Sequence, residues 1–448
     1  MKTKTRKILI KAVIVLLCVV ALTLGWIIFD ATVDRSGWRE TRGGYYYRDF
    51  HGHRVTGWLD TNDGRYYLDG DGWMVTGWQD IGGETYWFAP DGTMATGWRD
   101  IAGERFYFDP QGRRQEGWVE LDGSRYYLNP SLVTGWQEID GERRWFSPDG
   151  SMVTGWLILD ETYYLDENGV PLTGKADIDG STYYFLEDGS CFHGWIDLDG
   201  GRYYFSPDGS MATGWQELNG KRFFFDSDGV MVTGWLEDGE YRCYLTADDG
   251  MLTGAQEIDG DACYFTPDGI YVLLVNEDNP VSRSYVPELV DLDEHHKVAP
   301  VCLEPLTNML TDCLRAGGEY TINNTYRSYE EQQDILKTRI ERYMEEDPEL
   351  SDSEATLKAL AEVARPGTSE HQTGLCMDIN GAGVESVPWL LEHCWEYGFI
   401  LRFPEGKKDI TGIVYEPWHF RYVGTRVSIP MRDSGLCLEE YLGAAGRA

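Results

Sequence analysis

A segment of about 20 residues repeats along the first part of the chain, and it limits the possible folds more than any other feature of the sequence. Typical copies read TGWQDIGGETYWFAPDGTMA and HGWIDLDGGRYYFSPDGSMA. Each copy has two turn signals around a short aromatic run, and its Asp-Gly or Gly-Gly pairs supply the positive φ that tight hairpin turns need. One hairpin alone cannot bury aromatic side chains on both faces. We therefore predict that residues 36–272 form a β-solenoid of stacked hairpins.

Length and charge limit the class of protein further. The chain has 448 residues, too many for one ordinary core, so the sequence predicts several domains. Its 52 glycines and 14% aromatic residues favour short strands and tight turns over long helices. The formal charge of −36 would repel nucleic acid, and no basic patch follows the N-terminus. We therefore expect no DNA or RNA partner.

The first 35 residues combine a basic start with an apolar run. Ala12–Phe29 contains no charged residue, and a helix of that length would extend roughly 27 Å, close to the hydrocarbon thickness of a bilayer. The basic residues before this run favour a cytoplasmic N-terminus. We predict an uncleaved transmembrane signal anchor over residues 1–35, with the protein single-pass in the cell membrane and its bulk extracellular in the cell wall. A cleaved signal peptide is the alternative.

The 20-residue period ends near residue 272, and the remaining part has the spacing of a different fold. Apolar residues at helical intervals predict helices over residues 303–318, 328–346, 351–364 and 388–399. The runs LCMDI and WHFRYVG predict short strands. Residues 273–448 are therefore expected to form an α+β domain.

Nine cysteines are scattered along the chain without a CxxC pair, which argues against a zinc finger. An exported protein can form disulfides, but these spacings indicate no pairing. We expect most of the cysteines to be small buried residues.

Two separate clusters contain the residue types of a metal site. His371 and Asp378 flank Gly374, where the chain can turn and bring the imidazole back toward the carboxylate. An aspartate in the apolar run LCMDI needs a partner, because an unpaired buried carboxylate is costly. In EPWHF, Glu416 precedes His419 by three positions. Hydrolytic zinc sites typically have three His or carboxylate ligands and a nearby glutamate that acts as a general base. Spacing alone leaves open that these histidines are hydrogen-bonded core residues.

Four blocks of the C-terminal region, taken in order, resemble the VanY-type D-alanyl-D-alanine carboxypeptidases, zinc peptidases that trim peptidoglycan. The blocks are LLVNEDNPV, YRSYEEQQ, ARPGTSEHQTGLCMDI and WEYGFILRFPEGKKDITGIVYEPWHFRYVG. The similarity extends over roughly residues 273–441. It implies a zinc-dependent enzyme that removes the C-terminal D-alanine from peptidoglycan stem peptides.

The resemblance also implies roles for individual residues. The family's zinc ligands fall on His371, Asp378 and His419, and its catalytic base falls on Glu416. Its substrate-contacting arginine matches Arg327, which either stabilises the oxyanion formed during hydrolysis or binds the terminal carboxylate of the peptide. The remaining matches to substrate-binding positions are Gln332, Ser369 and Tyr415.

Two positions depart from the family's pattern. Cys376 stands where alanine is usual, and Thr325 stands where glycine is usual before Tyr-Arg-Ser. In an extended strand Cys376 shares a face with Asp378, whereas Leu375, Met377 and Ile379 share the other. The cysteine either perturbs the metal site or is a tolerated small residue.

The repeats resemble the cell-wall-binding repeats of choline-binding and glucan-binding bacterial surface proteins. The shared pattern is G-W, G, an aromatic pair and D-G-x-M-x-T-G-W. In choline-binding members, rings of successive repeats surround a quaternary ammonium. The position before the aromatic pair, usually aromatic there, is occupied in this chain by Arg65, Thr85, Arg105, Arg125, Thr182 and Arg202. Because arginine would repel choline, another wall glycan or a teichoic polymer is a second possible ligand, and a spacer without a ligand is the third possibility.

Together these features predict a membrane-anchored wall hydrolase, in which the repeats attach to the wall and a Zn²⁺ carboxypeptidase acts on stem peptides. An L,D-carboxypeptidase or endopeptidase acting on the same peptides is one alternative, because loops set the depth of the pocket. A non-catalytic wall-binding surface protein is the other.

Overall fold

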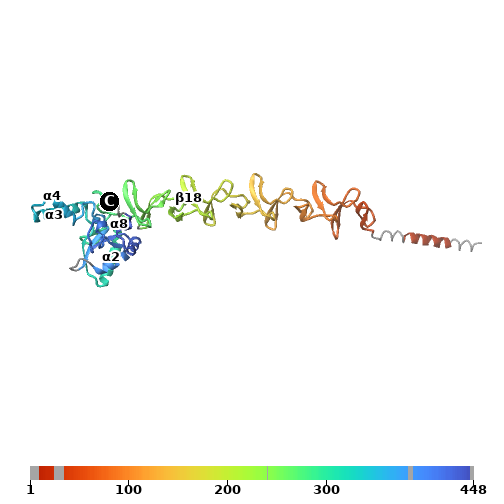
Figure 1. Ribbon diagram of the computed structural model, residues 1–448. Coiled ribbons are helices and arrows are strands. Elements are labelled where there is room, and N and C mark those ends of the chain that lie inside the picture. The colour runs from red at the N-terminus through yellow and green to blue at the C-terminus, as the bar shows by residue number, and fades with distance from the viewer. Residues whose placement is uncertain (1–9, 25–34, 240, 382–386, 444–448) are drawn as a thin grey trace, which may run out of the picture. The chain divides into compact units, whose positions relative to one another are not determined.

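The computed structural model describes residues 10–24, 35–239, 241–381 and 387–443. The chain folds as two compact units, Met1–Phe192 and His193–Ala448. The first unit contains the earlier repeats, and the second contains the later repeats and the C-terminal domain (Figure 1). The domain boundaries expected near residues 35 and 272 stay predictions.

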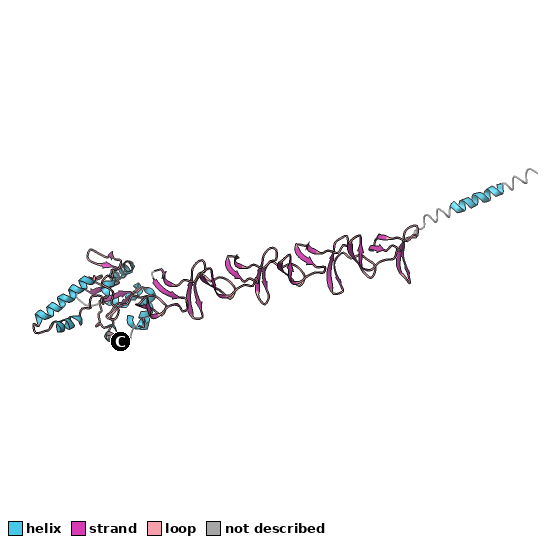
Figure 2. Ribbon diagram, turned by 90° about the horizontal axis from the view of Figure 1, so that it is seen from above, coloured by secondary structure: helices cyan, strands magenta, loops and turns pink. Residues whose placement is uncertain are grey.

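The repeats form short antiparallel hairpins (Figure 2). A typical turn, between β9 and β10, has positive φ at both central residues, 52° at Asp122 and 79° at Gly123, as tight hairpin turns require. The pairs are β1 (Gly37–Thr41) with β2 (Gly44–Arg48), β3 (Gly57–Thr61) with β4 (Gly64–Leu68), β5 (Gly77–Ile81) with β6 (Glu84–Phe88), β7 (Gly97–Ile101) with β8 (Glu104–Phe108), β9 (Gly117–Leu121) with β10 (Ser124–Leu128), β11 (Gly135–Ile139) with β12 (Glu142–Phe146), β13 (Gly155–Ile158) with β14 (Thr162–Leu165), β15 (Gly174–Ile178) with β16 (Ser181–Phe185), β17 (Gly194–Leu198) with β18 (Gly201–Phe205), β19 (Gly214–Leu218) with β20 (Lys221–Phe225), β21 (Gly234–Asp238) with β22 (Tyr241–Thr246) and β23 (Gly250–Met251), and β24 (Gly254–Ile258) with β25 (Asp261–Phe265).

The predicted β-solenoid is wrong, because the strands pair within hairpins and not into a sheet shared by successive repeats. The tight turn closes each strand onto its own partner. Neighbouring repeats meet through single backbone hydrogen bonds, such as the one from the Met94 N–H to the Arg65 carbonyl at 2.8 Å, and through aromatic side chains. The Trp38 ring centre lies 4.8 Å from that of Tyr66 in the next repeat, and Trp58 lies 5.0 Å from Tyr86. Edge-to-face contacts of this kind stabilise beyond the area that they bury.

The predicted transmembrane helix is also wrong. In the described part of the chain, no helix combines the length and the apolar character needed to cross a membrane. The described helix at the N-terminus covers residues 10–24. Its length is about 22 Å, which is shorter than the hydrocarbon thickness of a bilayer, about 30 Å. The last part of the predicted span, residues 25–29, lies outside the described residues.

The C-terminal domain is built on a four-stranded antiparallel sheet. The strand order is β28 (Tyr320–Asn324), β29 (Cys376–Gly381), β31 (His419–Tyr422) and β30 (Phe399–Leu401). The predicted strands in LCMDI and WHFRYVG are confirmed as β29 and β31. A small separate pair is formed by β26 (Val290–Asp291) and β27 (Lys297–Val298).

Helices cover this sheet and connect its strands. One face packs against α2, where Leu306 and Met309 join Met377, Ile379 and Phe420 in a single buried cluster. The four predicted helical segments are confirmed as α2 (Pro300–Arg315), α3 (Tyr329–Glu346), α4 (Asp352–Leu360) and α5 (Pro388–His393), the last continued by η2 (Cys394–Tyr397). The shorter elements are η1 (Glu370–Thr373), α6 (Lys408–Thr411), α7 (Thr425–Ser434) and α8 (Leu438–Tyr441). The eight cysteines after residue 18 are buried free thiols, which confirms the prediction made for most of them.

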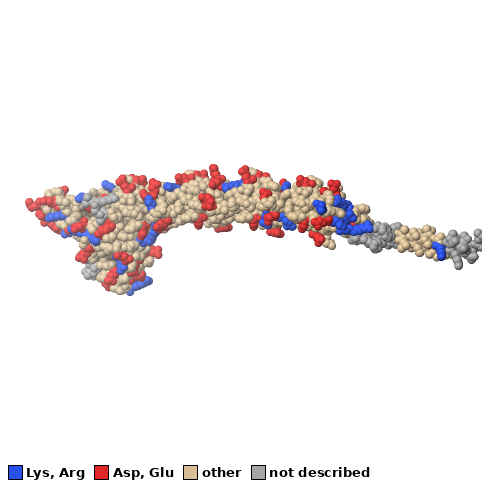
Figure 3. Space-filling view, turned by 45° about the vertical axis from the view of Figure 1, so that its right-hand side comes forward, with Lys and Arg blue, Asp and Glu red and all other residues tan. Residues whose placement is uncertain are grey.

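Acidic residues outnumber basic ones in the chain, with 75 Asp and Glu against 39 Lys and Arg. On the face drawn in Figure 3 the acidic residues are spread over both the repeats and the C-terminal domain, in keeping with the net charge of −36. A polyanion approaching this face would meet charge of its own sign.

The last repeat is packed into the C-terminal domain. Tyr264 and Ile270 belong to a buried cluster with Val427, Met431 and Leu438. Nearby, the backbone N–H of Arg426 donates to the Tyr241 hydroxyl at 3.3 Å. The repeat array and the C-terminal domain therefore share one hydrophobic core at this point.

A fragment that starts at residue 273 is expected to unfold at a lower temperature than one that starts at residue 232. The shorter fragment loses the burial provided by Tyr264, Ile270 and Val272, and each fully buried large side chain contributes about 1.5–3 kcal/mol. Thermal unfolding of both fragments, followed by circular dichroism, measures the difference. Equal melting temperatures would contradict this role of the last repeat.

Candidate metal and substrate site

The pairing of β29 with β31 separates the core from a group of side chains that could hold a metal ion. Met377 pairs with Phe420 on the face that packs against α2, whereas Asp378 pairs with His419. Successive side chains of a strand point to opposite faces, so Cys376 lies on the same face as Asp378. This confirms the predicted division of the strand.

His371 reaches the same face from η1. The chain turns at Gly374, whose φ is 67°, and the imidazole comes back toward β29 as the sequence predicted. Its Nδ1 donates to the Thr325 carbonyl at 2.7 Å. The opposite ring nitrogen, Nε2, lies 3.3 Å from Asp378 Oδ2. The backbone bond therefore fixes the orientation of the ring and leaves Nε2 available as a ligand.

The three predicted metal ligands lie together. His419 Nδ1 lies 3.1 Å from Asp378 Oδ1, and the two imidazole ring centres are 5.0 Å apart. His371, Asp378 and His419 are 5%, 8% and 4% exposed. Two imidazoles and a carboxylate form the donor set of many hydrolytic zinc sites.

Unsatisfied polar atoms support a cation at this position. Asp378 Oδ1 is buried and makes no hydrogen bond within the described residues, although a histidine nitrogen lies beside it. A shared cation, either a proton or a metal ion, stabilises so close an approach of a nitrogen and a carboxylate oxygen. Burial alone would lower the pKa of His371, but the neighbouring Cys376 and Asp378 raise it to about 9. The same negative surroundings favour a divalent ion, and the residues present therefore fit Zn²⁺.

Glu416 lies beside these donors at the wall of a pocket. Its Oε2 is 3.5 Å from His419 Nδ1. Burial raises the pKa of this carboxyl group above its usual value, while the charge of His419 acts in the opposite direction. A glutamate with a raised pKa is suited to accept and return a proton near neutral pH.

The pocket has a volume of about 590 Å³ and brings together most of the predicted site residues. The predicted residues that line it are His371, Asp378, His419, Glu416, Arg327, Gln332 and Ser369. Tyr415 is not among the lining residues and is 42% exposed. A volume of this size is ordinary for small-molecule and peptide-end sites.

Arg327 is held at the pocket by hydrogen bonds at both ends. Its backbone N–H donates to the His371 carbonyl at 3.0 Å, and its Nη1 donates to Gln332 Oε1 at 2.6 Å. Gln332 Nε2 in turn donates to the Ala364 carbonyl at 2.7 Å. Arg327 directly precedes Ser328, the N-cap of α3, so the start of that helix positions the guanidinium.

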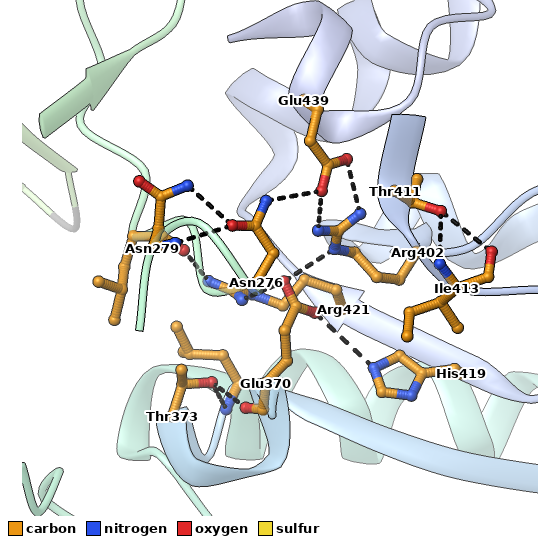
Figure 4. Close-up of polar contacts among 12 residues, drawn as sticks. Asn276, Asn279, Glu370, Thr373, Arg402, Thr411, Ile413, His419, Arg421 and Glu439 are labelled. Atoms are coloured by element: carbon orange, nitrogen blue, oxygen red, sulfur yellow. Dashed lines mark hydrogen bonds and ion pairs between the residues drawn. The ribbon is translucent and has the colours of Figure 1, made fainter. Parts of the chain in front are cut away.

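A buried network of charged side chains lies next to His419, on the side of its Nε2 atom (Figure 4). Glu370 Oε2 lies 3.7 Å from His419 Nε2, and its Oε1 accepts from Arg402 Nε at 2.8 Å and lies 2.9 Å from Arg421 Nη1. Arg402 also donates to both carboxylate oxygens of Glu439, at 2.9 and 2.5 Å. Two acidic and two basic side chains thus balance one another in the interior, as buried charges require.

The network continues to the last repeat. Asn276 Nδ2 donates to Glu439 Oε1 at 3.2 Å, and Asn276 Oδ1 accepts from Asn279 Nδ2 at 2.8 Å (Figure 4). The Tyr264 hydroxyl, in β25, donates to Asn279 Oδ1 at 2.7 Å. A continuous chain of polar contacts therefore joins β25 to the charged residues around His419.

Sequence reasoning missed this network. Arg402 in the run FILRF and Arg421 in HFRY were visible signals, because a charge within an apolar strand needs a buried partner. Their partners, Glu370 and Glu439, are distant in the chain and show no pattern of their own. The sequence named Cys376 as a departure but did not predict that its thiol would lie within reach of both histidines, as it does.

Family comparisons agree with these features. Residues 295–425 match the family VanY, D-alanyl-D-alanine carboxypeptidase. Residues 56–74 match a putative cell wall binding repeat. Matches to the choline-binding repeat cover residues 75–99, 95–131, 133–170, 172–213 and 212–252.

Individual proteins are similar to separate parts of the chain. A D-alanyl-D-alanine carboxypeptidase of Enterococcus faecalis is 40% identical over 177 residues, which are 38% of this chain and 65% of that protein. A mutant of the vancomycin resistance D,D-pentapeptidase VanY, solved in complex with Zn(II), is 37% identical over 38% of this chain and 97% of its own, with a TM-score of 0.35. Choline binding protein F from Streptococcus pneumoniae is 27% identical over 55% of this chain and 95% of its own, with a TM-score of 0.34. The chain spans between 48% and 65% of the length of the curated relatives it matches.

The chain is thus a repeat protein of the wall-binding class that ends in a metallopeptidase-type domain. Through residues 295–425 it belongs to the VanY family of D-alanyl-D-alanine carboxypeptidases, and the repeats before them are of the choline-binding and cell wall binding types.

Replacing Arg402 with alanine is expected to destabilise the C-terminal domain by about 3–5 kcal/mol, because it leaves Glu439 buried without a counter-charge and Glu370 paired with Arg421 alone. Urea unfolding of the full-length protein, read from the transition of this domain, measures the loss. Arg432→Ala is the control, since Arg432 is exposed, pairs with Asp433 and lies over the Trp395 ring, so its loss should cost about 1 kcal/mol or less. Similar effects of the two substitutions would contradict the structural role of the network.

Proposed function

We propose that the protein is a zinc-dependent carboxypeptidase that removes the C-terminal D-alanine from peptidoglycan stem peptides, and that its repeats attach it to the cell wall, where it acts. The observation that carries this proposal is the meeting of two imidazoles, a carboxylate and Glu416 at one wall of a pocket. Membership of the VanY family supports the substrate class.

His371, Asp378 and His419 would hold the metal ion. A zinc ion bound there would polarise the peptide carbonyl and make a water molecule more acidic. Glu416 accepts the proton of the attacking water as oxygen adds to the carbonyl carbon. When the C–N bond breaks, Glu416 passes the proton to the leaving amine of D-alanine. Its raised pKa suits both transfers.

Arg327 supplies positive charge on the substrate side. Its guanidinium is fixed by Gln332, so little side-chain entropy is lost when a substrate oxygen binds. The planar fork fits the terminal carboxylate that every carboxypeptidase substrate carries. Gln332 is 1% exposed and Ser369 is 6% exposed, so both are buried residues of the pocket lining.

The substitution Glu416→Gln is expected to abolish D-alanine release while zinc remains bound, because the amide keeps the shape of the side chain but cannot accept the proton. Mass spectrometry of defined penta- and tetrapeptide muropeptides measures release and identifies the bond that is cut, and elemental analysis measures zinc. Glu405→Gln, at an exposed position outside the pocket lining, is the matched control. Undiminished release by the Glu416 variant would contradict the proposed base.

The repeats carry a positive group where a choline cage would bind its ligand. The Arg65 guanidinium lies 4.4 Å from the Trp58 ring centre, and Arg143 lies 3.8 Å from Trp136. The same contact, at 4.4–5.2 Å, is made to the tryptophan of the paired strand by Arg105, Arg125, Arg202, Arg222 and Arg242. These cation–π pairs support a wall ligand other than choline, either a glycan or a teichoic polymer, because the ring faces already hold a cation.

Titration of the full-length protein with choline at physiological ionic strength is therefore expected to give no saturable heat. The salt is needed because the strongly acidic chain attracts any small cation. Trp195→Ala, which removes the ring beneath Arg202, should behave like the wild type in this calorimetric test. Saturable choline binding that disappears in the Trp195 variant would contradict the proposed role of the arginines.

A further inference from the structure

The thiol of Cys376 lies inside the donor cluster. One donor atom from each of His371, Cys376 and His419 lies within 4.8 Å of the other two. All three side chains are buried, and Cys376 is 0% exposed. The pleat of β29 explains this position, because residues 376 and 378 are two apart and point to the same face.

A second, independent observation also indicates that a cation binds in this cluster. Asp378 Oδ1 is buried and makes no hydrogen bond to any residue that the structure describes, although the Asp378 side chain faces both imidazoles at 3.1 and 3.3 Å. Two acidic donors, the thiol and the carboxylate, therefore face the same pair of imidazoles. An alanine at position 376 would leave only the carboxylate.

We propose that Cys376 is a second anionic ligand of the metal ion held by His371 and His419. The chain then carries two overlapping donor sets, His371–Asp378–His419 and His371–Cys376–His419. This inference rests on the proposed zinc site but extends beyond the ligands that the family resemblance implies.

Sulfur changes which metal the site prefers. Thiolate is a soft ligand and favours Zn²⁺ and heavier soft ions over hard ions such as Mg²⁺ and Mn²⁺, whereas the His–His–Asp set alone discriminates less. When both acidic donors bind, all four positions of a tetrahedral zinc ion are filled by the protein, as in structural zinc sites. Cys376 therefore adds affinity and selectivity, and it competes with water for the position used in hydrolysis.

The zinc-loaded full-length protein tests the inference directly. X-ray absorption at the zinc edge should contain one zinc–sulfur distance of about 2.3 Å beside the shorter zinc–nitrogen and zinc–oxygen distances. Spectra with no sulfur contribution would overturn the proposal, and this measurement needs no variant that has to fold.

Cobalt substitution provides a second measurement. The Co²⁺-loaded wild type should show the near-ultraviolet charge-transfer band of a thiolate–cobalt bond, and Cys376→Ala and Cys376→Ser should lose it. Cys394→Ala should keep the band, because Cys394 is equally buried but lies in the core cluster away from the donors. A wild type that binds Co²⁺ without this band would also overturn the proposal.

Metal affinity gives the expected size of the effect. Partners of metal ligands that do not touch the metal already change affinity by about 10–100-fold, so losing a direct thiolate should weaken Cd²⁺ binding at least about tenfold in Cys376→Ala. Affinity equal to that of the wild type would count against the proposal. These measurements do not depend on D-alanine release. A protein that binds metal through sulfur but releases no D-alanine would contradict the proposed carboxypeptidase function and still support Cys376 as a ligand.

Discussion

The register between β29 and β31 is the constraint on which the site depends. It places Met377 against Phe420 in the core and Asp378 against His419 on the opposite face. A slip of one residue would exchange the two faces, driving a carboxylate into the apolar core and the methionine into the pocket. The cost of burying an unpaired charge therefore fixes the register, and the register fixes the metal site.

The buried network behind His419 extends this constraint beyond the sheet. Glu370 contacts His419, and it is itself held by Arg402 and Arg421. Glu439 completes the charge balance. Hydrogen bonds through Asn276 and Asn279 connect it to Tyr264 in the last repeat. Such networks stabilise only when every member is paired, so the last repeat contributes to the surroundings of the metal site as well as to the hydrophobic core.

The sequence predicted the local elements well and the pairing between repeats poorly. Alternation in LCMDI and the turn at Gly374 were sufficient to place Asp378 and His371 together, because both effects are local. The solenoid prediction failed because turn signals specify a hairpin but not whether neighbouring hairpins join into one sheet. The arginines that precede most of the aromatic pairs were recognised as positive charges. Their stacking on a tryptophan of the paired strand, as for Arg65 on Trp58, depends on the hairpin register.

The sequence by itself determined the order of the parts, the hairpin-forming repeats and the residue types of the metal site, because glycine turns, apolar periodicity and the spacing of His and Asp act over short stretches of chain. Only the tertiary structure decided that Glu370, Arg402, Arg421 and Glu439 neutralise one another, that Cys376 lies within reach of both imidazoles, and that the last repeat shares a core with the C-terminal domain. These contacts join residues distant in the chain, and their free energy depends on burial and on the distance between charges, which exist only once the chain has folded.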